Sequence, residues 1–335
     1  MRVGLIGAGV VGGRRAALVA NTPGAELITV ADALIDRAAH LAGEYEAEAV
    51  ADWRHVAESP EIDTVIVSAS NDIHAPASIA ALEAGKNVLC EKPLARTPDE
   101  AREVHMAAKR TGLTLKTGFN HRHYPAVLHA RKIADSGELG SILWMRCRYG
   151  HKGTGPIDKG WFVQPEISGG GTFLDNGVHV LDICRWFMGD FVEACGFAVN
   201  TFWRSIDPVE DNGFGLFRTA DGRIAQVHAS WNQWEIIFSV EIFFERGSIA
   251  IDRSAHIRVA RRSSDWEEIE VEERHFHEPF QDSWRLDWLE FLAAVEEGRQ
   301  PLGNARDGWK AVEMAHAVYT SSRERRFVTL GAEPA

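Results

Sequence analysis

The chain has 335 residues, of which 45% are hydrophobic and 25% charged, a composition typical of a folded protein. This length exceeds what one core usually supports, so two domains are expected. The formal net charge of −12 argues against nucleic acid and anionic membranes as partners. No apolar run approaches the roughly 20 residues of a membrane-spanning helix. Four cysteines without CxxC spacing predict free thiols and a cytoplasmic protein.

The first 118 residues alternate short apolar runs with alanine-rich stretches of helical periodicity. Strands are expected at 2–7, 26–32, 64–68, 86–90 and 114–118, and helices at 11–21, 34–44, 73–84 and 98–110. Since the central runs are nearly free of charge and alternate with helices, they predict a parallel sheet covered on both faces. We therefore expect an α/β domain over residues 1–118, with a doubly wound parallel sheet of the Rossmann type.

Residues 119–335 follow a different pattern and are expected to form an α+β domain. Strands are predicted at 142–148, 193–203, 213–218, 224–231, 238–244, 248–251, 257–260 and 266–271, and helices at 178–187, 283–297 and 307–324. Several of these strands alternate in polarity, which favours a large, open, mostly antiparallel sheet with one buried face. Because such a sheet commonly finds a partner, we expect a homodimer or homotetramer formed through it.

A glycine-rich turn follows the first expected strand. Gly7, Gly9 and Gly12 match the G-x-G-x-x-G pattern and open a helix at Val10 and Val11. The first glycine permits the tight turn, the second lets the backbone approach a pyrophosphate, and the third allows close packing of helix on strand. The phosphates would lie at the helix N-terminus, where free N–H groups favour anions. The turn therefore predicts a dinucleotide site.

The second expected strand ends at Asp32, 20 positions after Gly12. A carboxylate at this position accepts hydrogen bonds from both ribose hydroxyls and repels a 2′-phosphate, which favours NAD over NADP. Arg14, Arg15 and Arg37 lie near enough in the sequence to complicate this preference, and the alternative is that they are solvent-exposed helix residues.

Lys92 follows the apolar strand expected to end at Cys90. The carboxyl edge of an open parallel sheet is where ligands bind, so this lysine is expected near the cofactor. Pro93 restricts it to an extended or turn conformation. Its position favours a role in proton transfer. Position alone is also compatible with an ordinary surface lysine.

Four motifs occur in order along the chain: SASNDIH at 68–74, EAGKNVLCEKPLA at 83–95, GFNHR at 118–122 and GGGTFLDNGVH at 169–179. Together they resemble the glucose–fructose oxidoreductase, inositol dehydrogenase and rhizopine-catabolism (Gfo/Idh/MocA) family. The resemblance covers nearly the whole chain. It implies a Rossmann domain, a C-terminal domain with an open antiparallel sheet, and hydride transfer at a sugar or polyol carbon. One departure is Ala69-Ser70, where many members carry Thr-Pro.

The resemblance also implies individual roles. Lys92 matches the family lysine that contacts substrate and assists proton transfer. Asp175 and His179 match its D-x-x-x-H pair, in which the histidine acts as general acid and base. Cofactor contacts are implied for Ser70, Asn71, His74, Glu91 and Lys92.

Asp175 and His179 also suggest this chemistry by their own spacing. Four positions apart at an expected helix start, they project from one face. Oxidation of an alcohol needs a base beside its hydroxyl, and histidine titrates in the right range. A capping aspartate with a core histidine is one alternative. A metal site shared with His121 and His123 is another, but hydride transfer to NAD needs no metal, so none is expected.

Asn120, His151 and Trp161 are candidate substrate contacts, since sugars present apolar C–H faces that stack on indoles. Taken together, these features predict an NAD-dependent oxidoreductase acting on a carbinol of a sugar, nucleotide-sugar or cyclic polyol. Two alternatives remain open. One is a glycosidase that uses bound NAD in a transient redox cycle, and the other is a dinucleotide-binding sensor without catalysis.

Overall fold

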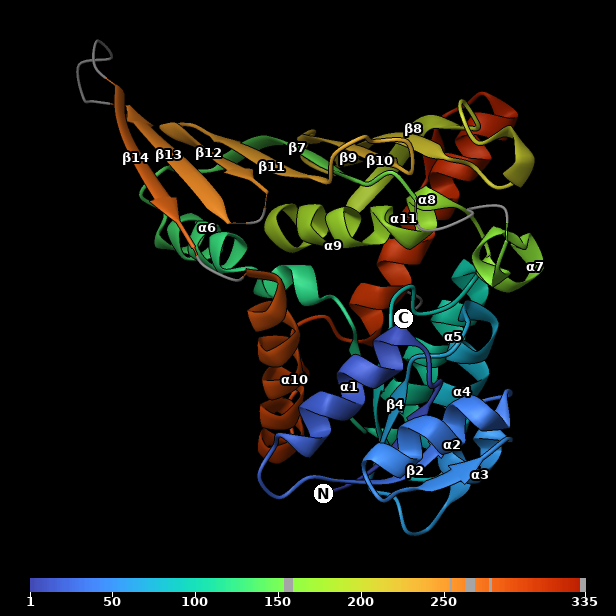
Figure 1. Cartoon of the computed structure of the whole chain (residues 1–335). Helices are drawn as coiled ribbons and strands as arrows, with labels where there is room; N and C mark the ends of the chain where they lie inside the picture. The colour runs from blue at the N-terminus through green and yellow to red at the C-terminus, as the bar shows by residue number, and fades with distance from the viewer. Residues whose placement is uncertain (154–158, 254, 263–268, 277–278, 332–335) are drawn as a thin grey trace. The chain divides into compact units, whose positions relative to one another are not determined.

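A computed structural model describes residues 1–153, 159–253, 255–262, 269–276 and 279–331 (Figure 1). The chain forms two compact units that are not contiguous in sequence. The first unit contains Met1–Phe119, Glu166–Gly169 and Asp287–Val312, and the second contains Asn120–Pro165, Gly170–Leu286 and Glu313–Ala335. A single boundary after residue 118, as the sequence suggests, would instead assign 166–169 and 287–312 to the second domain.

The first unit contains a six-stranded parallel sheet in the order β3-β2-β1-β4-β5-β6. This order confirms the expected doubly wound Rossmann topology. The strands are β1 (Arg2–Ile6), β2 (Glu26–Ala31), β3 (Glu48–Val50), β4 (Thr64–Val67), β5 (Asn87–Cys90) and β6 (Leu115–Thr117). The helices are α1 (Val10–Ala20), α2 (Ile35–Glu44), α3 (Trp53–Glu58), α4 (Asn71–Glu83) and α5 (Pro98–Thr111). Strand β3 and helix α3 were not expected, because each is too short to show a periodicity.

Helix α5 illustrates how local sequence sets these elements. Thr97 accepts a hydrogen bond from the amide of Glu100, and Pro98 occupies the first helical position. Gly112 ends the helix with a φ of +70°, a left-handed conformation that favours glycine. Both signals are readable in the sequence, and the helix lies within a residue of the expected range 98–110.

The core of the first unit explains why part of a distant helix belongs to it. Helix α10 (Pro279–Glu297) places Trp288 and Phe291 in the cluster formed by β1, β2 and α1, which includes Leu5 and Val19. The indole Nε1 of Trp288 also donates to the Thr22 hydroxyl at 2.9 Å. Truncation of a large buried aromatic side chain to alanine typically lowers the free energy of unfolding by about 3–5 kcal/mol. The second half of α10 is therefore part of this core.

The second unit contains a nine-stranded sheet in the order β14-β13-β12-β11-β7-β10-β9-β8-β15. Its pairs are antiparallel except β7 with β10, which confirms the mostly antiparallel sheet. The strands are β7 (Ile142–Gly150), β8 (Phe191–Val199), β9 (Asn212–Thr219), β10 (Ile224–Ser230), β11 (Ile237–Phe244), β12 (Gly247–Asp252), β13 (His256–Arg262), β14 (Ile269–His275) and β15 (Val328–Thr329). The strand expected at 266–271 lies partly outside the described residues.

Helices pack on one face of this sheet. In Figure 1, α6 (Pro125–Ser136) and α9 (Gly177–Met188) lie along it, and α6 was not expected from the sequence. The remaining helices are α7 (Pro165–Ser168), α8 (Thr172–Asp175) and α11 (Ala305–Glu324), with short 3₁₀ turns η1 (Asn120–His123), η2 (Trp161–Val163) and η3 (Arg204–Ile206). Among the described helices, none is both long enough and apolar enough to pass through a membrane.

Candidate active site

The glycine turn after β1 is fixed by close backbone packing. Gly7 has a φ of +98°, and a Cβ there would lie 2.6 Å from main-chain atoms of Ser68 and Ala69. A Cβ on Gly12 would overlap the carbonyl oxygen of Gly7, whereas a Cβ on Gly9 would meet nothing within 4 Å. The outer two glycines are therefore required by the fold. The middle one leaves an open approach to the backbone.

Helix α1 begins at this opening. Its N-cap is Gly9, no side chain caps its first turn, and no acidic residue lies in that turn. Val10 is largely exposed at the same place. Main-chain N–H groups at the start of α1, together with the helix dipole, fit the pyrophosphate of a dinucleotide.

Asp32 lies beside the turn, directly after β2. Its Oδ2 accepts a hydrogen bond from the Ala8 amide at 2.9 Å, and its Oδ1 accepts one from the Leu34 amide at 2.9 Å. Each carboxylate oxygen has a second lone pair available for a ribose hydroxyl. The carboxylate is thus held by the same turn that would hold the phosphates.

A buried ion cluster fixes the end of β5. The guanidinium of Arg15 donates to Glu91 Oε1 from Nε at 2.9 Å and from Nη2 at 2.6 Å, and to Asp287 Oδ2 at 2.9 Å. Lys116 lies 3.0 Å from the other oxygen of Asp287. Burial by itself lowers the pKa of Arg15, but the charges of Glu91 and Asp287 raise it overall. The alternative that Arg15 is a solvent-exposed helix residue is excluded, because its side chain is buried against partners from distant parts of the chain.

His74 joins two of the turns at the carboxyl edge of the sheet. Its Nδ1 lies 2.7 Å from the carbonyl oxygen of Pro93 and its Nε2 lies 3.0 Å from that of Ala69. Burial lowers the pKa of this imidazole, although both carbonyl groups favour the protonated form. The turn after β4 is thereby held to the turn after β5, which carries the half-buried Lys92.

The start of α4 is held in the same way. The Ser70 hydroxyl donates to Asp72 Oδ1 at 2.5 Å. The side-chain amide of Asn71 donates from Nδ2 to the main-chain carbonyl of Ser168 at 2.8 Å. Strands β1, β4 and β5 are neighbours and parallel. Their carboxyl ends therefore bring the glycine turn, residues 68–74 and residues 91–93 to one edge of the sheet.

In the second unit, Asp175 and His179 lie on consecutive helices. Asp175 ends α8, and Asn176 joins it to α9, whose first turn contains His179. The imidazole of His179 is 5% exposed and stacks on that of His121, with ring centroids 3.8 Å apart and planes 16° apart. A buried imidazole stacked in this way has a fixed orientation.

Tyr149 and His151, at the end of β7, lie beside these helices. The Tyr149 ring meets that of His179 edge-on at 5.9 Å. Burial, and next the negative charge of Asp175, raise the pKa of the Tyr149 phenol. The side-chain Nδ2 of Asn176 lies 3.1 Å from His151 Nε2. The structure therefore gathers Asp175, His179, Tyr149 and His151 in one place.

Asn120 and Trp161 have other surroundings. Asn120 is buried and donates from its amide to the Ser283 hydroxyl at 3.0 Å. Trp161 is half-exposed and packs edge-on against Phe162, which in turn meets Trp231. The contacts described for these two residues are thus structural ones.

Glu210, which holds the N-terminus of α8, carries no motif and was not expected from the sequence. Its carboxylate accepts from the amides of Gly171 and Phe173 and from the Tyr319 hydroxyl, each at 2.8 Å. The Tyr319 oxygen also accepts from the Leu174 amide at 3.1 Å. Burial raises the pKa of Glu210 to about 7, although these donors lower it. The helix that carries Asp175 is therefore fixed by a buried carboxyl group.

A second buried pair holds α9. Arg122 binds Asp182 in a bidentate manner, from Nε and Nη2, with both distances 2.6 Å. Arg122 is next to His121 on η1, and Asp182 is on the helix that carries His179. This pair therefore sets the distance between the two stacked imidazoles. In the sequence, this pair is indicated only by the GFNHR motif, whose last residue is Arg122.

Family models match both parts of the chain. One described as "Oxidoreductase family, NAD-binding Rossmann fold" matches residues 1–119, and one described as "GFO/IDH/MocA C-terminal domain" matches residues 127–250.

Curated relatives include a 1,5-anhydro-D-fructose reductase of Ensifer adhaerens, 30% identical over 74% of this chain and 74% of the relative. An inositol 2-dehydrogenase of Saccharopolyspora erythraea is 28% identical over 96% of this chain and 94% of the relative. A levoglucosan dehydrogenase of Pseudarthrobacter phenanthrenivorans is 33% identical, but the match covers only 59% of that enzyme and 66% of this chain.

Solved structures agree with these matches. A levoglucosan dehydrogenase in complex with NADH superposes with a TM-score of 0.91 at 26% identity, covering 99% of each chain. The complex with NADH and levoglucosan gives 0.89 at 26% identity, covering 99% of this chain and 100% of that one. The relatives thus share the fold of both units, and NAD is the cofactor of the family.

Proposed function

Since the chain belongs to the Gfo/Idh/MocA family of NAD-binding oxidoreductases, we propose that it oxidises a carbinol carbon of a sugar, nucleotide-sugar or cyclic polyol, or reduces the corresponding carbonyl. The arrangement around His179 is the observation that carries this proposal. An imidazole fixed by stacking, with a carboxylate at the end of the preceding helix, suits proton transfer to or from a substrate hydroxyl. The names of the relatives support the substrate class.

The proposed reaction divides an alcohol C–H and O–H between two acceptors. Bound NAD would supply the acceptor for the hydride that the carbon gives up, and His179 would accept the proton that the oxygen gives up. Lys92 would assist the proton transfer, as its match to the family lysine implies. Asp175 would orient the imidazole or bind a neighbouring hydroxyl.

The first unit would hold the cofactor through its own groups. The amides at the start of α1 would bind the pyrophosphate, with Gly9 leaving room for its approach, and Asp32 would bind the adenosine ribose. The proposed contacts from Ser70, Asn71 and His74 would lie at the same sheet edge. Glu91 is already occupied by Arg15 on one oxygen, so we propose that it acts mainly by fixing the loop of Lys92.

A substrate panel tests this function. Levoglucosan, L-sorbose and the inositols would be offered with NAD, and 1,5-anhydro-D-fructose with NADH, and the absorbance of NADH followed. Turnover of at least one of these compounds or a related polyol is expected. Release of sugar from a glycoside with no net change in NADH would favour the glycosidase instead. Tight NADH binding without turnover of either kind of substrate would favour the sensor.

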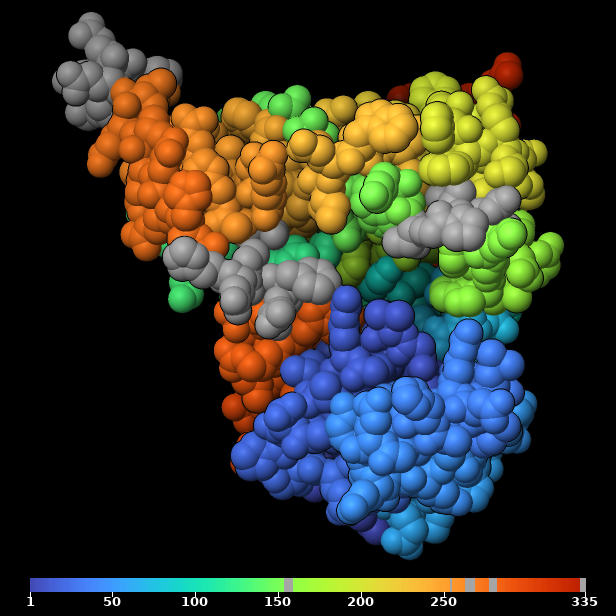
Figure 2. All heavy atoms as spheres, in the orientation of Figure 1, coloured from blue at the N-terminus to red at the C-terminus, as the bar shows by residue number. Residues whose placement is uncertain are grey.

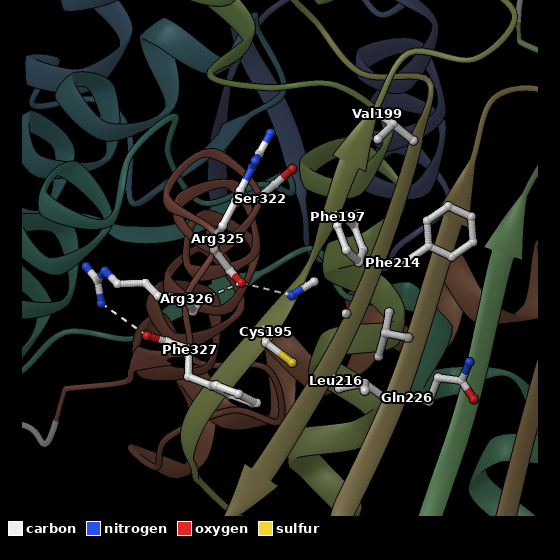
Figure 3. A pocket seen from close by; sticks show the side chains of 14 residues that line it. Cys195, Phe197, Val199, Phe214, Leu216, Gln226, Ser322, Arg325, Arg326 and Phe327 are labelled. Atoms are coloured by element: carbon white, nitrogen blue, oxygen red, sulfur yellow. Dashed lines mark hydrogen bonds between the residues drawn. The ribbon is translucent and has the colours of Figure 1, made fainter.

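We also propose that two or more copies associate through the uncovered face of the nine-stranded sheet. Phe197 (65% exposed), Phe214 (42%) and Leu216 (46%) lie side by side there on β8 and β9, at the edge of a hollow bordered by the end of α11 (Figure 3). Trp144 and Ile224 extend the same apolar face. Contiguous exposed apolar side chains of this kind mark an interface.

Light scattering after size exclusion measures this association. The wild-type chain is expected to elute as a dimer or tetramer, and Phe214→Asp to shift it toward the monomer. Leu289→Asp, which changes an exposed leucine on α10, is the matched control and should leave the mass unchanged. A monomeric wild type would refute the association.

A further inference from the structure

Three side chains that bind metals gather at one end of the nine-stranded sheet. His256 on β13 lies directly opposite His275 on β14, and Glu273 precedes His275 by two residues. Residues two apart on a strand share a face, so all three lie on the same side of the sheet. Ile257 and Val259 of β13 are buried on the other side. In Figure 2, strands β13 and β14 (orange) reach the surface at this end of the sheet.

The donor atoms of these residues lie close together. His256, Glu273 and His275 each offer one metal-ligating atom, and these three atoms lie within 4.8 Å of one another. Among the described residues, no other set of three such side chains meets this condition. The two imidazole rings are stacked, with centroids 4.3 Å apart and planes 7° apart. His256 Nε2 lies 3.7 Å from Glu273 Oε2. That nitrogen is buried and makes no hydrogen bond, which is unusual for a polar atom and is relieved by a ligand.

Neighbouring charges orient the carboxylate. Arg258 Nε lies 2.8 Å from Glu273 Oε1, so the guanidinium engages one oxygen while the other faces His256. Asp252 of β12 lies opposite His256 in the ladder and adds a negative charge on the same face. The two carboxylates and one guanidinium around the imidazoles together carry a net negative charge, which favours a cation.

We propose that His256, Glu273 and His275 bind a divalent transition metal ion, with zinc as the best match. Two imidazoles and one carboxylate form a set that zinc accepts, with water as the fourth ligand. Tetrahedral bonds of about 2.0–2.1 Å would bring the donors to about 3.4 Å from one another. The donor atoms must therefore approach one another by up to about an ångström, and the two imidazole rings must turn out of their parallel stack so that both lone pairs face the ion. Copper and nickel ions would compete for the same donors.

Such an ion would tie β14 to the rest of the sheet. Strand β14 pairs with β13 alone in the described sheet, and most of its side chains are exposed. It is therefore stabilised by few apolar contacts, and a bridge between His256 and His275 would reduce its opening. None of the three proposed ligands takes part in the proposed hydride transfer. An experiment that refutes the metal site would therefore leave the proposed function standing, and the reverse also holds.

Metal binding to the full chain tests the proposal. Protein stripped with a chelator would be titrated with zinc chloride by calorimetry, and with Co²⁺ while its visible absorption is followed. We expect one equivalent to bind and to give the intense bands of a tetrahedral cobalt site. His256→Ala and His275→Ala should each weaken binding at least about tenfold and remove those bands. Hydrogen exchange of β14 should slow when zinc is added to the wild type only.

The matched control is His40→Ala, which removes an exposed histidine beside a single carboxylate, Glu44, at 3.6 Å. It should bind zinc as the wild type does. The proposal would be overturned if stripped wild-type protein bound no zinc saturably, or if His256→Ala and His275→Ala bound it unchanged. Turnover of the alcohol substrate by both variants should match the wild type.

Discussion

In the first unit, groups of the candidate site follow one another along the chain at the ends of parallel strands, and close backbone packing at Gly7 and Gly12 shapes the turn between them. In the second unit, the helices that carry Asp175 and His179 are held by Glu210 and Arg122, residues distant from them in the sequence. A site whose geometry is set by residues close together in the sequence can be predicted from the sequence. A site fixed by distant buried partners is not predictable in this way, even where its reactive residues carry a motif, as Asp175 and His179 do.

The proposed division of labour assigns the cofactor to the first unit and proton transfer to the second. His179→Ala should therefore lower kcat about 10²–10⁴-fold, the usual contribution of a general base. Its affinity for NADH, measured by fluorescence titration, should stay near that of the wild type. His55→Ala, an exposed histidine of the first unit, serves as the control. Activity of His179→Ala within about tenfold of wild type would contradict the assigned role.

Arg15 tests whether the ion cluster stabilises the first unit. Arg15→Met leaves the buried carboxylates of Glu91 and Asp287 without their partner, so the free energy of unfolding should fall by about 3–5 kcal/mol. Arg14→Met, at the exposed neighbouring position, should change it by less than about 0.5 kcal/mol. Denaturant titration measures both. Equal effects of the two substitutions would show that the cluster is not a determinant of stability.

Glu210 makes the stability of the second unit depend on pH. Its folded pKa of about 7 lies above the ordinary value of 4.5, so the folded state binds the proton more tightly. Stability from this group is fully present below about pH 4.5 and is lost as the pH rises through 7, by up to about 3 kcal/mol. Thermal unfolding across this range should show a decline that is flatter in Glu210→Gln. Parallel curves for the two proteins would exclude this group as the cause.

Two adjacent glycines of α1 separate steric need from helix propensity. Gly12→Ala forces the new methyl group against the Gly7 carbonyl, so it should destabilise the fold by about 1–3 kcal/mol and weaken NADH binding. A Cβ at Gly13 meets nothing within 4 Å, so Gly13→Ala should stabilise by up to about 1 kcal/mol. Chemical denaturation and NADH titration of both variants decide this. Normal NADH binding by Gly12→Ala would contradict the description of the turn.

Much of this fold was predictable because its signals are local. Alternating strands and helices predicted the parallel sheet, and polarity alternation predicted the open antiparallel one. Strands β3 and β15 and helices α3, α6, α7 and α8 were missed, since all of them except α6 are short and α6 lies outside both regular patterns. The burial of Arg15 was not predicted, because nothing near it in the sequence reveals Asp287 or Lys116.

The residues of the candidate site likewise divide into those that a sequence motif indicates and those that only the packing reveals. The D-x-x-x-H motif pointed to Asp175 and His179. The structure adds Tyr149 beside them, and it stacks His121, which the sequence grouped with them only as a metal ligand, on His179. A histidine in a motif can be identified by its chemistry, but its stacking partner follows from how η1 and α9 pack. Glu210 carries no motif, and only its hydrogen bonds to α8 show what it does.

The most direct test of hydride transfer uses a substrate from the panel in which every carbon-bound hydrogen is replaced by deuterium. After turnover with NAD in ordinary water, mass spectrometry of the reduced cofactor should show one deuterium per molecule, whichever carbon reacts. The His179→Ala variant should form this product far more slowly. Reduced cofactor without deuterium would contradict direct transfer from a carbinol carbon.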